Sequence, residues 1–366
     1  MKPILLTTTM SLLFASAVSG IAHAELKNES NAASADSAAV ERLITQWPNR
    51  PKLGAREMIV KYGLPQEASS EKLVWNNAGP YRRIMVTREE IPHDFPKPHM
   101  DFLEHTIEYN VPLDKIEDLI EFDGSNTINR TAGELSARCD LEGHNILTLN
   151  LNHDIVTGKK SVKEARTAFG EEIVKDQLGE HPPYVEALQF QPTGKSARFP
   201  DEPVIPGSPV RTMKLETGKD AATAEVLAFV IAADDNEILA AAKAGKKKMS
   251  GDAAAYAKML HIEHGKNQAA TMKLGMKLDI VPTDTPAVDA LRVKGAGGLA
   301  ALTTLKGEKF EKAYLAAMVK GHEEVLEMID NKLMKMTDDE EVRKQLTETR
   351  GHVVAHLEQG KRLQKM

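Results

Sequence analysis

The sequence predicts two domains of different fold class, a mixed α+β domain followed by an all-α four-helix bundle. Over residues 45–190, short alternating patterns typical of strands are interspersed with helical patterns. From residue 218 to 366, Ala, Met, Lys and Glu dominate, aromatic residues are few, and apolar residues recur at intervals of three and four. Residues 191–217, which contain five prolines, are expected to be a linker or an extended arm against one domain.

The first 24 residues have the pattern of a secretory signal peptide. Lys2 precedes an apolar stretch from Ile4 to Val18, and Ala22-His23-Ala24 has the form of a cleavage site, so we expect cleavage after Ala24. The stretch is too short to span a bilayer, and no later segment reaches the ~20 apolar residues that a transmembrane helix needs. The mature protein is therefore expected in the periplasm or outside the cell, beginning with a flexible leader over residues 25–44.

The composition of the chain limits which cross-links and which kinds of binding partner are expected. The single cysteine, Cys139, excludes an intramolecular disulfide and is expected to be a small buried apolar residue. The formal net charge of −6 is mild and the two signs are mixed along the chain, which argues against nucleic acid as the main partner. An envelope protein or a small ligand is the expected partner.

The α+β domain is expected to combine short helices with hairpins. Gly63 and Pro65 end its first helix, and Asn77-Ala-Gly-Pro80 is a turn between two strands. Ser161, with Glu164 three residues later, predicts a capping box. The expected helices are 54–62, 114–122, 142–155 and 161–177, and the expected strands are 72–76, 81–87 and 105–111, with a further strand or loop over 131–139.

Four helices are expected in the bundle, at 223–247, 251–278, 307–336 and from Thr337 or Asp338 onward. Each has roughly 25 residues and so a length near 37 Å, which suits a bundle. Phe310, Tyr314 and Met318 begin the apolar stripe of the third helix. The glycine- and proline-containing segment 279–299 is expected to be a long crossover connection.

Polar residues interrupt the apolar faces of all four helices near their middles. One carboxylate and three imidazoles, one from each helix, are expected to meet in a single layer: Glu237, His264, His322 and His356, with Glu263 and His352 as additional members. Burial of such groups without partners costs several kcal/mol. They could hydrogen-bond to one another as structural core residues, or they could bind a divalent Zn, Fe, Mn or Cu ion.

A second group of histidines lies in the α+β domain. His93, His99 and His105 occur within thirteen residues together with three carboxylates, a composition that could bind a metal. Pro92, Pro96 and Pro98 keep this segment extended, so helical spacing cannot be used to predict its geometry. A polar surface loop before a strand is the alternative interpretation.

Three segments of the bundle resemble the domain-of-unknown-function family DUF4142. They are Tyr256-Ala-Lys-Met-Leu-His-Ile-Glu263-His264-Gly-Lys-Asn267, Phe310-Glu-Lys-Ala-Tyr314-Leu-Ala-Ala-Met318-Val-Lys-Gly-His322, and the stretch from Thr349 that ends in His356-Leu357. The resemblance implies an exported bacterial domain with a ferritin-like bundle and, weakly, metal binding. It covers none of residues 25–215. The paired Glu-x-x-His of di-iron bundles is missing, which argues against oxygen activation.

The sequence therefore predicts an exported cell-envelope binding or scaffold protein with a ferritin-like bundle. The alternative function is metal binding by the layer of Glu237 and the three histidines, for storage, sensing or stress protection. Enzymatic activity is left open but is the less favoured expectation. A hydrolase that uses the α+β domain has the least support, because the chain has no Gly-x-Ser-x-Gly elbow, phosphate-binding loop or dinucleotide fingerprint.

Overall fold

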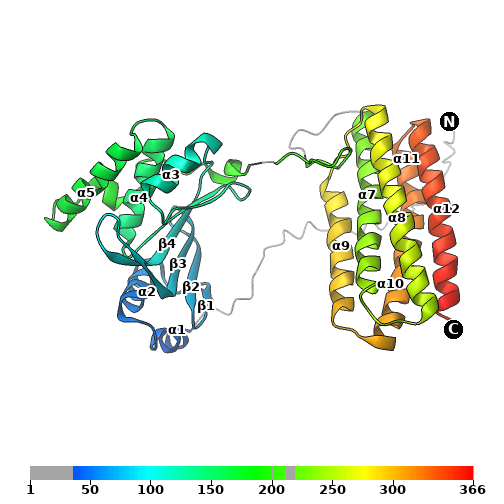
Figure 1. Cartoon of the computed structure of the whole chain (residues 1–366), viewed down its shortest axis with the longest axis horizontal. Helices are drawn as coiled ribbons and strands as arrows, with labels where there is room; N and C mark the ends of the chain where they lie inside the picture. The colour runs from blue at the N-terminus through cyan, green and yellow to red at the C-terminus, as the bar shows by residue number, and fades with distance from the viewer. Residues whose placement is uncertain (1–35, 200, 212–218, 366) are drawn as a thin grey trace, which may run out of the picture. The chain divides into compact units, whose positions relative to one another are not determined.

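The computed structural model describes residues 36–199, 201–211 and 219–365 (Figure 1). The expected signal peptide and residues 25–35 of the expected leader lie outside the described residues. The chain divides between residues 200 and 201 into two compact units, which we name the N-terminal and the C-terminal unit. Over the described ranges, the structure contains no helix with both the length and the apolar character that membrane crossing requires.

The N-terminal unit is built on a six-stranded antiparallel sheet with the strand order β1-β2-β3-β4-β6-β5. The strands are β1 (Glu67–Ala68), β2 (Lys72–Ala78), β3 (Tyr81–His93), β4 (His99–Glu108), β5 (Thr127–Asn129) and β6 (Glu134–Cys139). Strands β3 and β4 extend further than expected, because a register shift between Val86 and Ile91 lets pairing resume beyond the first ladder. The segment interpreted as a surface loop therefore contains the end of β3 and the start of β4.

Helices α1 (Ser37–Ile44), α2 (Asn49–Tyr62), α3 (Ile116–Phe122), α4 (Glu142–Val156), α5 (Val162–Gln177) and α6 (Pro183–Glu186) complete this unit, with 3-10 turns η1 (Leu113–Lys115) and η2 (Gly194–Ala197). The prediction of a flexible leader is wrong for residues 37–44, which form α1. Val40 and Ile44 of this helix are buried in the core. The capping box of Ser161 and Glu164 is present at the start of α5.

The C-terminal unit consists of long helices that lie side by side (Figure 1). They are α7 (Lys219–Ala244), α8 (Gly251–Leu278), α9 (Pro286–Thr303), α10 (Gly307–Met328) and α12 (Glu340–Leu363), with a π-helical turn η3 (Ile329–Leu333) and a short α11 (Met334–Met336) after α10. Helix α8 packs against α7 and α12, and α10 packs against α12 and α7, whereas α9 contacts α7 and α10.

Two sequence expectations for this unit are corrected. The segment 279–299 was expected to be a connection, yet Thr285 caps a helix there whose first residue is Pro286, a favourable combination at a helix start. Gly295 permits the close approach of α9 to α7, because a Cβ atom at this position would lie 2.1 Å from Oδ1 of Asn236. The second correction concerns the start of the last helix, which was expected at Thr337 or Asp338. The helix is instead capped by Asp339, whose carboxylate accepts from the backbone N–H groups of Glu341 and Val342.

The described parts of the proline-rich segment are packed at both ends. The backbone N–H of Phe199 donates to the carbonyl of Arg130, whose guanidinium lies 3.9 Å from the centre of the Phe199 ring. In the C-terminal unit, the N–H of Val210 donates to the carbonyl of Pro282. Each described end of the segment therefore contacts the unit to which it belongs, and residues 200 and 212–217 lie outside the described chain.

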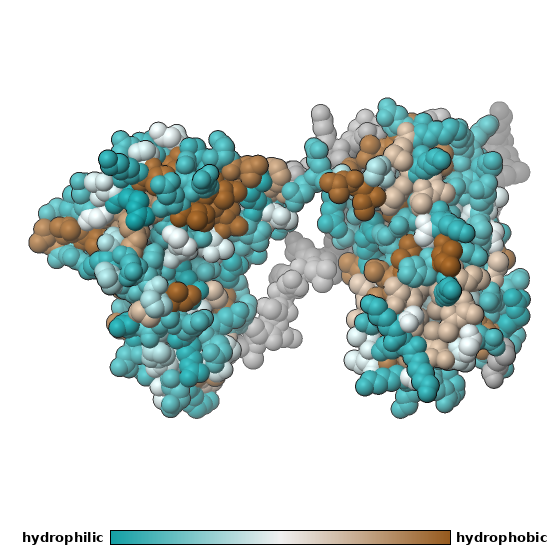
Figure 2. All heavy atoms as spheres, in the orientation of Figure 1, coloured by the Kyte–Doolittle hydropathy of each residue, from teal (hydrophilic) through white to brown (hydrophobic). Residues whose placement is uncertain are grey.

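The apolar cores of the two units are organised differently. The N-terminal unit has one core cluster around the sheet, with Trp75 and Phe122 fully buried. The C-terminal unit has two separate apolar clusters, one around Val226, Ile329 and Leu346, the other around Tyr256 and Phe310. Most of the surface in view in Figure 2 is hydrophilic on both units. Buried polar residues of the helices lie between these two apolar clusters.

Candidate metal centre

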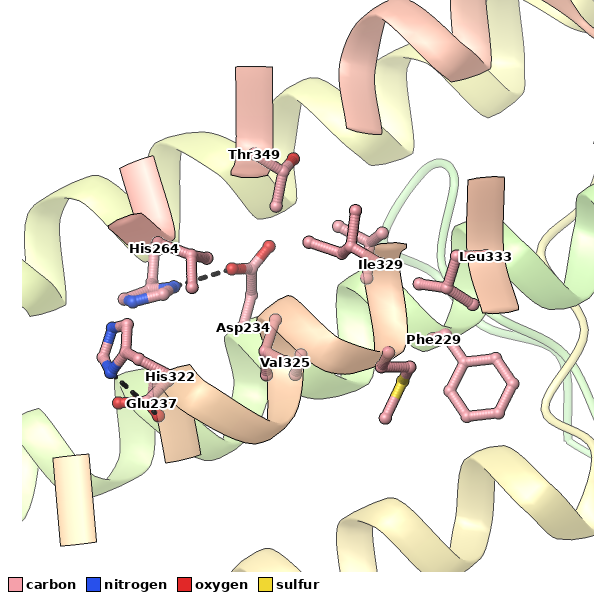
Figure 3. Close-up of a pocket in the computed structure, with 13 residues that line it drawn as sticks. Phe229, Asp234, Glu237, His264, His322, Val325, Ile329, Leu333 and Thr349 are labelled. Carbon is pink, nitrogen blue, oxygen red and sulfur yellow. Dashed lines mark hydrogen bonds and ion pairs between the residues drawn. The ribbon is translucent and has the colours of Figure 1, made fainter. Parts of the chain in front are cut away.

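Three histidines from three helices meet between the two apolar clusters of the C-terminal unit. His264 comes from α8, His322 from α10 and His356 from α12, and their exposed fractions are 6%, 1% and 2%. Figure 3 shows the rings of His264 and His322 turned toward each other. The structure thus brings together three of the four residues that the sequence predicted for this layer.

Each of the three imidazoles has one ring nitrogen held by a hydrogen-bond partner. Nδ1 of His264 lies 2.8 Å from Oδ1 of Asp234, Nδ1 of His322 donates to the carbonyl of Met318 at 2.6 Å, and Nε2 of His356 lies 2.7 Å from Oε2 of Glu263. These contacts fix the orientation of each ring. The carbonyl of Met318 can only accept, so Nδ1 of His322 carries the ring proton, and the carboxyl groups of Asp234 and Glu263, when ionised, favour the proton on the nitrogen that they contact.

The other nitrogen of each ring is buried and has no hydrogen-bond partner in the described parts of the chain. These atoms are Nε2 of His264, Nε2 of His322 and Nδ1 of His356. One ligand atom from each of the three residues lies within 4.8 Å of the other two. Three buried histidines with ligand atoms this close, each held by a partner at one ring nitrogen, form a cluster that could hold a metal ion.

The spacing of the rings matches metal coordination. With metal–nitrogen bonds of about 2.0–2.1 Å, ring centres lie roughly 3.2 Å from a bound ion and about 5.2 Å apart if the bonds meet at tetrahedral angles. The three observed separations between ring centres are 5.0, 5.4 and 5.5 Å. The three rings could therefore reach one ion with little rearrangement.

Burial keeps these imidazoles neutral. It lowers the pKa of His264 to about 4 and that of His322 to about 3, and it also lowers the pKa of His356. A neutral imidazole has a free lone pair, whereas an imidazolium has none. At neutral pH the cluster consequently presents lone pairs without competition from protons.

Glu237 lies beside the three histidines. Its Oε1 is 4.0 Å from Nδ1 of His322, the nitrogen that His322 turns away from His264 (Figure 3). Its Oε2 is buried and has no hydrogen-bond partner within the described residues. Burial raises the pKa of Glu237 to about 8, so the carboxyl group is largely protonated at neutral pH. The predicted carboxylate thus adjoins the layer without joining the three-nitrogen cluster.

Asp234 is a part of the site that the sequence reasoning missed. Its carboxylate contacts His264 through one oxygen and accepts from Nδ2 of Asn267 through the other, at 2.8 Å in both cases. Burial raises its pKa well above the usual range, and a nearby divalent cation would favour its ionised form. The available signal was its position on α7, three residues before Glu237 and therefore near the same face.

The two additional members predicted for the layer have different positions. Glu263 accepts from His356, and this hydrogen bond lowers the pKa of the Glu263 carboxyl group. His352 lies at the surface, where its Nδ1 is 3.8 Å from the same carboxylate. Glu263 consequently orients a histidine of the cluster, and His352 adds a partner at the edge.

Two cavities adjoin Glu237. A small one of about 20 Å³ lies beside His264, His322 and Asp234 and has mostly apolar walls, among them Phe229 and Ile329 (Figure 3). This is enough space for about one water molecule or ion. A larger cavity of about 380 Å³ lies between α7, α9 and α10. Because Glu237 lines both cavities, a small molecule in the larger one could reach its carboxyl group.

The second group of histidines predicted from the sequence, His93, His99 and His105, is only partly brought together in the N-terminal unit. His93 and His99 pair across β3 and β4 and lie with Asp101 in one group of ligand atoms. His105 does not belong to this group: it is fully buried further along β4, where Nδ1 accepts from Asn145 and Nε2 lies 3.6 Å from Glu142. The expectation that all three histidines cluster is therefore corrected for His105.

The chain thus combines an α/β unit with a helical unit in which buried histidines form a cluster that could hold a metal. The model of the family described as a domain of unknown function, DUF4142, matches residues 209–363. This match confirms the resemblance for the C-terminal part, and the N-terminal part has no family match. Comparison with curated proteins and with solved structures found no match.

Proposed function

We propose that this protein is an exported metal-binding protein whose C-terminal unit holds one divalent transition-metal ion between α8, α10 and α12. The observation that carries the proposal is the set of three buried, unpartnered ring nitrogens on His264, His322 and His356. A purely structural core would pair these nitrogens, because an unsatisfied buried polar atom costs about 1–3 kcal/mol. A metal ion would satisfy all three nitrogens at once.

The donor set favours Zn²⁺ or Cu²⁺ among the candidate ions. Three neutral imidazoles with a fourth position left for water or a small ligand are typical of zinc sites that do chemistry, and Cu²⁺ binds nitrogen donors most tightly in the divalent series. Mn prefers oxygen ligands and the common Fe²⁺ triad includes a carboxylate, whereas the carboxylates here occupy supporting positions on His264 and His356. An ion in this layer would acidify its bound water, and Glu237 is the nearby group that could exchange a proton.

We further propose that α7, α8, α12 and α10 form a ferritin-like four-helix arrangement, with α9 as an added helix. The packing order supports it, since each of these four helices contacts the next and α10 contacts α7. Export is proposed from the N-terminal sequence, where Lys2, the apolar stretch and Ala22-His23-Ala24 have the order of a signal peptide.

Metal analysis of the purified full-length protein tests the proposal. Protein recovered from the exported fraction, with an intact mass that begins at Glu25, should contain about one ion per chain at the three histidines after equilibration with Zn²⁺ or Cu²⁺ and dialysis. The variant H264A/H322A should lose this ion. The control H261A, which changes an exposed histidine on the same helix α8, should keep it.

Two outcomes would overturn metal binding. One is a wild-type protein that retains no ion at these histidines after equilibration with Zn, Cu, Fe or Mn. The other is an ion content that H264A/H322A leaves unchanged. A folded, metal-free protein whose variant loses only stability would support the scaffold function instead.

The supporting carboxylate of Asp234 gives a second expected result. D234N keeps the size of the side chain and removes the charge that orients His264, so the affinity for Zn²⁺ should fall about 10–100-fold while binding stays stoichiometric. Competition titration with a chromophoric chelator measures this change. D235N, on the neighbouring residue that pairs with Arg292 and Gln268, is the matched control and should leave the affinity unchanged. An equal loss in both variants would contradict a specific role for Asp234.

A further inference from the structure

A second cluster of metal-ligand side chains lies in the N-terminal unit, at the end of the β3–β4 hairpin. His93 and His99 are direct cross-strand partners, so their side chains lie on the same face of the sheet. Asp101 follows His99 by two residues and points to that face as well. The rings of His93 and His99 are 5.0 Å apart at their centres, and the Asp101 side chain is almost fully buried.

His99 faces the Asp101 carboxylate with the ring nitrogen that the backbone does not hold. Its Nδ1 lies 2.9 Å from the carbonyl of Lys97, which can only accept, so this nitrogen carries a proton. In the neutral ring, Nε2 is then an acceptor, and it lies 3.0 Å from Oδ1 of Asp101. Oδ1 is buried and has no hydrogen bond within the described ranges. A proton on Nε2 would pair His99 directly with this carboxylate, and in the neutral ring a metal ion could bind both Nε2 and Oδ1.

His93 completes the set. Its Nδ1 lies 3.3 Å from Oδ2 of Asp101 and 3.2 Å from Oγ of Ser125, and its Nε2 lies 3.7 Å from Oδ1 of Asp123. Single ligand atoms of His93, His99 and Asp101 all lie within 4.8 Å of one another. Asp123 and Ser125 therefore surround the set as partners that could orient His93 or bind a metal-bound water.

We propose that the N-terminal unit holds a second divalent transition-metal ion on His93, His99 and Asp101. Two imidazoles and one carboxylate are ligands typical of Fe²⁺ and Zn²⁺ sites that leave coordination positions open. This site lies in a different unit and uses none of the residues of the C-terminal cluster. Its existence is consequently independent of the function proposed above, and either site can fail without the other.

Cys139 is the competing ligand at this place. Its Sγ lies 3.2 Å from Nε2 of His99, and His99, Cys139 and Asp140 form an overlapping set of ligand atoms within 4.8 Å. The Cys139 thiol also lies 3.4 Å from Oδ1 of Asp140 and 3.6 Å from Nδ1 of His144, and His93 is not part of the set that contains Cys139. We assign the ion to His93, His99 and Asp101, with Cys139 as an uncoordinated neighbour.

Titration of the metal-free full-length protein with Zn²⁺ and with Co²⁺ tests the assignment. We expect about two ions per wild-type chain, about one in H264A/H322A, and about one in D101N, with affinity at the N-terminal site weakened at least about 10-fold. D101N keeps the side-chain size, and its circular dichroism spectrum should match that of the wild type. H181A, which changes an exposed histidine near Asp176 and Glu186, should still bind two ions.

The Co²⁺ spectrum separates the two ligand sets. Coordination by His93, His99 and Asp101 should give visible absorption bands without a thiolate-to-cobalt charge-transfer band, and C139S should leave the spectrum unchanged. A charge-transfer band that C139S removes would overturn the assignment in favour of Cys139. The site itself would be overturned if H264A/H322A bound no ion, if D101N bound like the wild type, or if H181A removed the ion.

Discussion

Zn²⁺ at about 1,000 times its dissociation constant should stabilise the C-terminal unit by about 4 kcal/mol, provided that the ion binds only the folded state. The three histidines lie on different helices, α8, α10 and α12, so they come together only in the folded chain. For a unit of this size the gain corresponds to a rise in Tm of roughly 8–16 °C. Thermal melts followed by helical circular dichroism, with Zn²⁺ and with a chelator, measure it.

The two tryptophans provide an internal control for this experiment. Trp47 and Trp75 both belong to the N-terminal core, so tryptophan fluorescence follows the N-terminal unit alone. In H264A/H322A, the ion should no longer shift the melting of the C-terminal helices, whereas any shift of the fluorescence transition should persist. A helical transition that Zn²⁺ raises equally in the wild type and in this variant would contradict binding at the histidines.

Acidification of the metal-free protein should destabilise the C-terminal unit strongly. The pKa values of His264 and His322 are about 4 and about 3 in the folded state, against about 6.5 in the unfolded chain. Below pH 6.5 the unfolded state therefore binds protons that the folded state does not bind, and stability is lost as the pH falls toward 3. The loss is about 3 kcal/mol for His264 and about 5 kcal/mol for His322 as order-of-magnitude values.

Urea unfolding in the presence of a chelator at a series of pH values between 7 and 3 measures this loss. H322Q should flatten the pH dependence, because glutamine does not titrate, whereas H261A should reproduce the wild-type curve. An unchanged slope in H322Q would show that other groups dominate. Glu237 acts in the opposite direction, since a carboxyl group with a raised pKa stabilises the folded state at low pH and loses that contribution as the pH rises through about 8.

The histidine cluster could be predicted because helical periodicity places His264, His322 and His356 on apolar faces near the middle of each helix. The orienting groups were harder to predict. Asp234 precedes another aspartate in the sequence, and such a pair is usually interpreted as a solvated surface. The carbonyl of Met318 is a backbone group that no sequence pattern identifies as a partner of His322.

The fold was predicted least well where glycine and proline were interpreted as breaks in regular structure. In α9, glycine allows close packing against α7, and Pro286 occupies a favourable place at the helix start. In the β3–β4 hairpin, Pro92 lies within β3, and strand pairing nevertheless continues as far as His93 and His99. The long-range register that brings these two residues together depends on the bulge after Val86, which local sequence does not specify.

The separation of the C-terminal core into two apolar clusters bears on how a bound ion could be exchanged. In a zinc finger, the metal supplies most of the folding free energy, and release of the ion means collapse of the domain. Here hydrophobic contacts hold the helices on both sides of the histidines, independently of any ion. An ion bound as proposed could therefore leave through local loosening of the histidine layer, while the two apolar clusters keep the helices packed.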